Sequence, residues 1–310
     1  MNNELSKVEK LALSIATCNE IKTACQDEKH PCREIVNLQD HRANPFRQSP
    51  EPWAGNLEKA PLLFVSSNPS ISEGESDAES FPNVESHSGL PIHFDWSVDN
   101  LVDFHTNRFD QSREKPFVKS SSHYLCKDGE YRGPVKYWRE VFKLAKFIFG
   151  KEIDISNDLC LTEVVHCKSK GEIGVNKKSR NKCAENYMSR ILQASNAKMV
   201  VCYGAQARAY FTSEVGAGVR TEVDKNFGRF SSSPISGVHH LGILEIGSTK
   251  TLLCALKHNS GRGGNEGKTF ESALGKELAK SFATLYQAIV KGAEPVPESR
   301  EALLKRLGVV

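Results

Sequence analysis

The sequence predicts a three-layer α/β/α fold with a mostly parallel central sheet. Two observations support this prediction. Short apolar runs bounded by turn residues alternate with segments of helical periodicity. The apolar runs also lack a polar residue at every second position, as expected for strands that are buried on both faces. Alternation of such strands with helices is typical of a parallel sheet covered by helices on both sides.

The N-terminal half contains two regular elements and two irregular stretches. Residues 4–28 are predicted to form a helix, because Leu5, Val8, Leu11, Ile15 and Ile21 recur at helical spacing. Residues 30–59 are rich in Pro, Asn and Gln and are predicted to form a loop. A short apolar strand follows at residues 61–66, and residues 72–134 form an irregular insertion. An irregular stretch of that length inside a domain is usually functional or disordered.

Regular alternation begins after the insertion. The predicted helices span residues 135–149, 181–194, 205–212 and 270–290, and the predicted strands span residues 159–166, 199–203, 240–246 and 250–256. We therefore divide the chain into an N-terminal helical segment (1–45) that carries candidate ligand cysteines, an α/β domain (46–292), and a peripheral tail (293–310).

Composition and charge indicate an ordinary globular protein. The 310 residues are 39% hydrophobic and 25% charged, with a net charge of +3. No apolar run approaches the roughly 18 residues of a membrane span, and residues 1–10 lack the apolar core of a signal peptide. We expect a cytoplasmic monomer. One segment is strongly basic and suits either a solvated loop or a phosphate-facing surface; it contains Lys168, Lys170, Lys177, Lys178, Arg180 and Lys182.

Nine cysteines are many for a protein of a reducing compartment, where structural disulfides are rare. Cys160, Cys202 and Cys254 lie in apolar runs and are predicted to be core residues. The others include a group ahead of the first predicted strand, Cys18, Cys25 and Cys32, with six residues between neighbours. Cys167 and Cys183 follow later, with fifteen residues between them. Clustered cysteines of this kind indicate metal or redox chemistry.

Three polar motifs each follow a predicted strand. They are Ser67-Asn68-Pro69-Ser70, then Glu163 with His166 and Cys167, and finally His258-Asn259-Ser260 with the loop that runs to Gly264. The carboxyl ends of parallel strands meet at one edge of a sheet, where ligands of α/β proteins bind. The three motifs are therefore expected to form one polar site.

In this order, the motifs resemble those of the uracil-DNA glycosylase superfamily over residues 25–290. Phe64–Ser70 resembles the water-positioning first motif, with Asn68 at the residue that orients the attacking water. Leu161–Lys168 resembles the second strand of the iron–sulfur branch, and Met199–Phe211 is similar to a helper strand and helix. His258-Asn259-Ser260 stands where the family has its His-Pro-Ser type of motif.

The resemblance implies a [4Fe–4S] cluster, held by two cysteines before the first motif and two after the second strand. Cys167 and Cys183 match the later pair. Cys25 and Cys32 are chosen as the earlier pair because they lie nearest the core, although their spacing departs from the C-x-x-C of the family. A four-thiolate zinc site remains the alternative cofactor.

The resemblance also implies DNA as the partner and assigns roles to the site residues. Asn68, His258 and Glu163 are the catalytic candidates, with His258 donating to the pyrimidine O2. The candidates for base or DNA contact are Ser67, Pro69, Ser70, Ser260, Arg262 and Lys168. Uracil-specific members have Asn where this chain has Glu163. A carboxylate can accept from cytosine N4, and a protonated carboxyl can donate to N3. Alternatively, Glu163 pairs with a nearby lysine.

A glycosylase that removed plain cytosine would destroy its own genome, so the target is expected to be a marked base. This combination resembles the bacterial anti-phage glycosylases that excise α-glucosyl-hydroxymethylcytosine, and the insertion could widen the pocket for the C5 substituent. The protein would then work in the bacterial cytosol or nucleoid. Two alternatives stay open: a repair enzyme for uracil or another deaminated base, and a non-catalytic, cluster-bearing module that binds nucleic acid.

Overall fold

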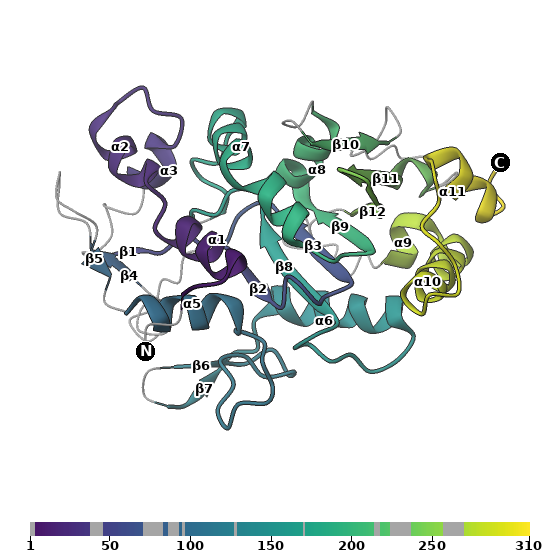
Figure 1. The fold of residues 1–310 in the computed structure, drawn as a ribbon, viewed down its shortest axis with the longest axis horizontal. Helices are drawn as coiled ribbons and strands as arrows, with labels where there is room; N and C mark the ends of the chain where they lie inside the picture. The colour runs from purple at the N-terminus through teal and green to yellow at the C-terminus, as the bar shows by residue number, and fades with distance from the viewer. Residues whose placement is uncertain are drawn as a thin grey trace.

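The computed structural model describes residues 4–37, 46–70, 97–126, 129–169, 171–213, 218–223, 237–256 and 270–310, with two short strands at 83–85 and 93–94. Its centre is a seven-stranded sheet of order β10-β11-β12-β9-β3-β8-β2, with helices on both sides (Figure 1). The strands are β2 (Trp53–Gly55), β3 (Leu62–Ser66), β8 (Leu159–Glu163), β9 (Met199–Tyr203), β10 (Val219–Glu222), β11 (Leu241–Ile246) and β12 (Thr249–Leu256).

The sheet is mixed. Its four middle strands β12, β9, β3 and β8 run parallel, as predicted. The flanking strands β2, β10 and β11 are antiparallel to their neighbours. The predicted pair of strands around Gly247 is confirmed as the β11–β12 hairpin, in which Gly247 adopts a positive φ of 60°.

Two hydrophobic cores lie on opposite faces of the sheet. On one face, Leu63 and Val65 of β3 pack beneath α1 (Lys7–Ala16), α7 (Lys177–Ala194) and α8 (Gly204–Thr212). On the other face, Leu62 and Phe64 pack beneath α6 (Lys136–Phe149), α9 (Phe270–Leu274) and α10 (Lys276–Val290). Because consecutive residues from Leu62 to Val65 enter different cores, all four are apolar and the strand shows no polar alternation before Ser66. The predicted three-layer arrangement, with helices packed on both faces of a central sheet, is confirmed.

The N-terminal segment differs from the single helix that its periodicity predicts. It forms α1, α2 (Glu20–Gln26) and α3 (Arg33–Asn37), and a break over residues 17–19 contains Cys18. The first helix ends at Ala16, and Thr17 caps its C-terminal end with its backbone amide, which donates to the Leu13 carbonyl at 2.9 Å. The chain can therefore turn at Cys18 and direct α2 toward α7, a change that periodicity alone does not reveal.

Two other segments also carry more structure than their patterns predict. The insertion contains α5 (Val98–Thr106) and the hairpin of β6 (Tyr124–Leu125) and β7 (Tyr131–Arg132), and a second small sheet joins β1 (Phe46–Gln48), β4 (Asn83–Glu85) and β5 (His93–Phe94). Helix α7 begins at Lys177 because the Asn176 side chain caps it. In the tail, α11 (Arg300–Arg306) packs on β11 and buries Leu303. Within the described ranges, no helix is long and apolar enough to cross a membrane.

Candidate functional site

The first two polar motifs lie side by side beyond the carboxyl ends of β3 and β8. The Val164 and Val165 amides donate to the Ser66 and Ser67 carbonyls at 2.9 and 3.0 Å. Farther along, the Ser169 amide donates to the Pro69 carbonyl at 3.0 Å. The two segments therefore continue the parallel pairing of their strands, which brings both motifs to the edge where the sequence predicts them. The third motif, with His258, Ser260 and Arg262, falls in residues 257–269, outside the described residues.

Asn68 is half-buried and held by hydrogen bonds from its amide nitrogen. Its Nδ2 donates to the Ser169 hydroxyl at 2.9 Å and to the Pro69 carbonyl at 2.9 Å. With the nitrogen engaged in this way, the side-chain oxygen is the atom left to accept a hydrogen bond. Next to it, Ser67 is buried, and its hydroxyl has no hydrogen-bond partner among the described residues.

Glu163 is the last residue of β8 and is 7% exposed. It lies opposite Ser66 of β3 in the sheet register, and the Ser66 hydroxyl acts to lower the pKa of its carboxyl. Burial and the negative charge of Glu51 raise the pKa of Glu163 to about 8, against the opposing effect of Arg108 and Lys168. Glu163 therefore keeps its proton near neutral pH.

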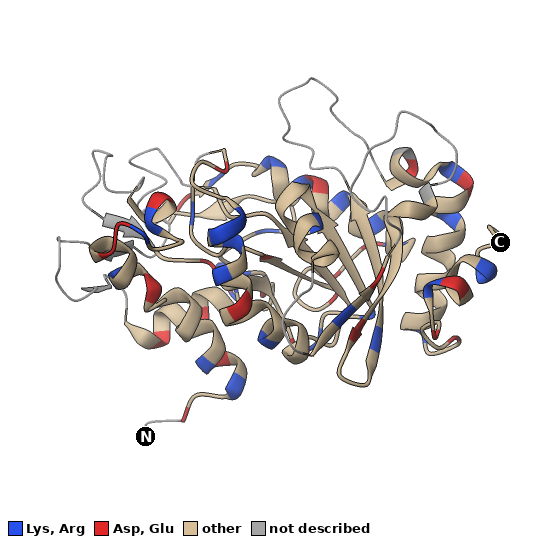
Figure 2. Ribbon diagram, turned by 90° about the horizontal axis from the view of Figure 1, so that it is seen from above, with Lys and Arg blue, Asp and Glu red and all other residues tan. Residues whose placement is uncertain are grey.

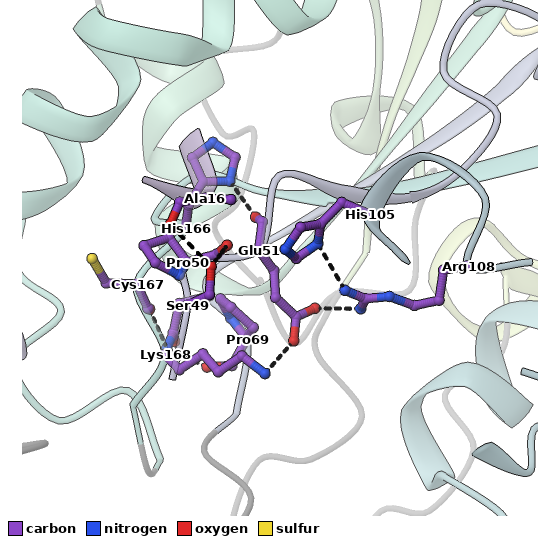
Figure 3. A network of polar contacts seen from close by, with 11 residues as sticks. Ala16, Ser49, Pro50, Glu51, Pro69, His105, Arg108, His166, Cys167 and Lys168 are labelled. Atoms are coloured by element: carbon purple, nitrogen blue, oxygen red, sulfur yellow. Dashed lines mark hydrogen bonds and ion pairs between the residues drawn. The ribbon is translucent and has the colours of Figure 1, made fainter. Parts of the chain in front are cut away.

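A buried ionic network adjoins Glu163 and is centred on Glu51 (Figure 3). Arg108 Nη1 lies 2.6 Å from one carboxylate oxygen of Glu51, and Lys168 Nζ binds the other. Arg108 also contacts His105 Nδ1 at 3.1 Å. Burial alone would raise the pKa of Glu51, but the charges of Arg108 and Lys168 hold it well below its usual range. Sequence reasoning missed Glu51, Arg108 and His105, because no motif or spacing joins them.

Lys168, which the family resemblance assigns to DNA contact, is 1% exposed and has its ammonium on Glu51. The preceding residue, Cys167, directs its sulfur away from this network (Figure 3). His166 is also buried, with Nδ1 2.7 Å from the Glu51 carbonyl. Burial lowers the pKa of His166 to about 4, so its ring is neutral. The segment after β8 thus separates two clusters of polar side chains.

The second cluster consists of four cysteines that line one narrow cavity between the N-terminal segment and α7: Cys18, Cys32, Cys167 and Cys183. The Tyr187 hydroxyl donates to Cys18 Sγ at 3.2 Å, and the His166 amide donates to Cys183 Sγ at 3.4 Å. Cys32, Cys167 and Cys183 belong to the predicted set. Cys25 does not line the cavity and Cys18 does, because the break after α1 turns Cys18 toward α7.

Glu20 joins the N-terminal segment to α7 beside these thiols. Its carboxylate lies 3.0 Å from Lys182 Nζ and accepts from Asn186 Nδ2 at 3.1 Å. His30 Nε2 lies 2.9 Å from the other oxygen, and the Cys32 amide donates to His30 Nδ1 at 3.1 Å. In the described part of the chain, no three His, Cys, Asp or Glu side chains are arranged to hold a single metal ion.

In the basic segment after β8, some side chains bind other residues of the protein, and others are exposed to solvent. Lys168 and Lys182 are paired with Glu51 and Glu20, and Arg180 binds Gln206 at 3.1 Å. Lys177 and Lys178 are exposed at the start of α7. Basic and acidic residues are interspersed over the helices in Figure 2.

Comparison with known protein families and with curated proteins finds no match to this chain.

Proposed function

We propose that this protein is a DNA glycosylase that hydrolyses the N-glycosidic bond of a modified cytosine swung out of DNA. The observation that carries the proposal is Glu163, a buried carboxyl that keeps its proton near neutral pH and lies beside the Asn68 loop at the carboxyl edge of the sheet. Perturbed carboxyls of this kind concentrate at catalytic sites. The uracil-DNA glycosylase-like form of the three-layer fold is part of the same proposal.

A protonated carboxyl suits the chemistry of a departing cytosine. Its hydroxyl can donate to N3 while its carbonyl oxygen accepts from the N4 amine. Uracil can leave as an anion, and a neutral amide such as Asn is enough to read its edge. Cytosine is a poor leaving group until N3 is protonated, so a buried acid is needed for that base in particular.

In the proposed reaction, the bond between C1′ and the base breaks, and its electron pair leaves with the base. The Glu163 proton passes to N3, and a water held by the Asn68 side-chain oxygen adds to C1′. The proton lost by that water goes to solvent, and a proton from solvent restores Glu163. His258, by family resemblance, donates to O2. The products are the free base and an abasic site.

Plain cytosine cannot be the substrate of an enzyme that coexists with its own genome. The proposed target is therefore cytosine with a C5 substituent, such as the α-glucosyl-hydroxymethylcytosine of phage DNA, and the proposed role is defence against phage. The insertion supports this proposal because it contributes Arg108 to the network beside Glu163, which places inserted chain next to the acid.

We also propose that Cys18, Cys32, Cys167 and Cys183 hold a [4Fe–4S] cluster. Two features support it: the four thiols line one cavity, and two of them accept hydrogen bonds from Tyr187 and His166, as cluster sulfurs do. A zinc ion needs its thiolates close around one atom, whereas cluster thiolates bind separate irons and can lie farther apart. When bound, the cluster would join the N-terminal segment to α7 as a structural cross-link.

The test is to incubate anaerobically purified protein with matched DNAs that contain cytosine, uracil, hydroxymethylcytosine or its α-glucosyl derivative. Alkali then breaks the strand at abasic sites. We expect breakage in the glucosylated DNA alone, and much slower breakage of that DNA with Asn68→Ala. Breakage in uracil DNA would indicate a repair enzyme instead. DNA binding without breakage in any of them would favour the non-catalytic module.

A further inference from the structure

Two buried carboxyls, Glu51 and Glu163, lie at the same edge of the sheet, and Glu51 engages two buried cations. One of its oxygens lies 2.6 Å from Arg108 Nη1, and the other binds Lys168 Nζ. The Arg108 and Lys168 side chains are 1% and 2% exposed, and that of Glu51 is 12% exposed. Glu51 is therefore the counter-ion of both cations.

The backbone holds Glu51 at this position. Its amide donates to the His166 carbonyl at 3.0 Å, and its carbonyl lies 2.7 Å from His166 Nδ1. The next residue, Pro52, accepts from the Thr162 hydroxyl at 2.7 Å. Because Trp53 pairs with Thr162 in the antiparallel β2–β8 ladder, these contacts extend that ladder and keep Glu51 beside the end of β8, where Glu163 lies.

The titratable and charged groups around Glu163 come from several elements: Glu51 before β2, Arg108 after α5, Lys168 after β8, Tyr137 on α6 and Cys160 on β8 itself. Apart from Glu163, these groups include two cations and one anion. If Glu51 were neutral, Glu163 would be the carboxylate beside two buried cations, and opposite charges at that range favour ionisation. When Glu51 is charged, ionisation of Glu163 would place a second carboxylate beside it. Like charges at that range disfavour ionisation, so Glu163 keeps its proton.

We propose that Glu51 is a positioning residue that keeps Glu163 as a neutral acid by serving as the counter-ion of both Arg108 and Lys168. The use of that proton on a departing base depends on the proposed function, whereas the protonation itself does not. After Glu163 has given its proton to the base, the same two cations stabilise its carboxylate until a proton from solvent replaces the one that was lost.

The test is a direct titration of Glu163 in full-length protein labelled with ¹³C at the glutamate side-chain carboxyls, with Glu163→Gln used to identify its signal. We expect a midpoint near pH 8 in the unchanged protein. In Glu51→Gln the midpoint should fall by about 1–3 pH units, the effect of an opposite charge on a carboxyl. In Arg108→Met it should rise. Glu152→Gln, which removes an exposed carboxylate from the far end of α6, should leave it unchanged.

An unchanged or higher midpoint in Glu51→Gln would overturn the proposal. If Glu51→Gln does not fold, Arg108→Met decides alone: a higher midpoint supports the proposal, and an unchanged or lower one overturns it. None of these titrations needs DNA, so a protein that titrates as expected but excises no base would lose the proposed function and keep this inference. Where excision is observed, Glu51→Gln should lose activity at a lower pH than the unchanged protein does, whereas purely structural damage would lower activity at every pH.

Discussion

Replacing Glu163 with Gln should stabilise the protein by an amount that grows with pH. Glutamine keeps the size of the side chain and its hydrogen-bonding capacity, and it stays neutral. The pKa of Glu163 is about 8 in the folded protein, against an ordinary value of 4.5. Between those values the unfolded chain releases this proton and the folded protein keeps it, so the stability of the unchanged protein falls as pH rises.

The magnitude follows from the width of that window. One pH unit corresponds to about 1.4 kcal/mol, so the full window from 4.5 to about 8 amounts to on the order of 5 kcal/mol. Below pH 4.5 Glu163 is protonated in both states, and Glu163→Gln should show no pH-dependent advantage. A residue that costs this much stability while filling a buried position is expected where activity requires it.

The assay is anaerobic urea unfolding of the unchanged protein, Glu163→Gln and the exposed control Glu152→Gln at pH values from about 5 to about 8.5. The difference in free energy of unfolding between the first two should widen steadily with pH, and the control should show no such trend. A difference that stays constant over this range would refute the reasoning. It would mean that Glu163 is ionised throughout and forms a neutral four-charge network with Glu51, Arg108 and Lys168.

Three other predictions follow from the same contacts. Cys18→Ser should lower the iron content and visible absorption of anaerobically purified protein, and Cys25→Ser should leave both intact. The reason is that Cys18 lines the thiol cavity and Cys25 does not. The reverse result would restore Cys25 as the ligand. Glu51→Met leaves the buried cations Arg108 and Lys168 without the carboxylate that both bind and should cost roughly 3–5 kcal/mol of stability, whereas Lys182→Met, whose pair with Glu20 is partly exposed, should cost at most about 1 kcal/mol; equal losses in chemical denaturation would contradict this ranking. Asn68→Ala should reduce excision by about 10²–10³-fold, the usual effect of removing one catalytic polar group, without changing DNA affinity in a binding titration; unchanged excision would remove Asn68 from the mechanism.

The sequence by itself determined the layers, the four parallel strands and the place where polar residues gather. Continuous apolar runs such as residues 61–66 and 199–203 can be satisfied only by burial on both faces, so their pattern is sufficient to identify them as central strands. Asn68 and Glu163 could be singled out for a similar reason, because each follows or ends such a run and parallel strands end at a common edge.

The tertiary structure decided which side chains become partners across large separations in sequence. The buried ionic network joins Glu51 from a loop, Arg108 from the insertion and Lys168 from the segment after β8. No local sequence pattern predicts that these three side chains are in contact. The choice of Cys18 over Cys25 depends on where the chain breaks between α1 and α2, and both positions suit the helical period. Local sequence determines which surface an element must bury, whereas the pairing of buried charges and thiols depends on how the elements pack against one another.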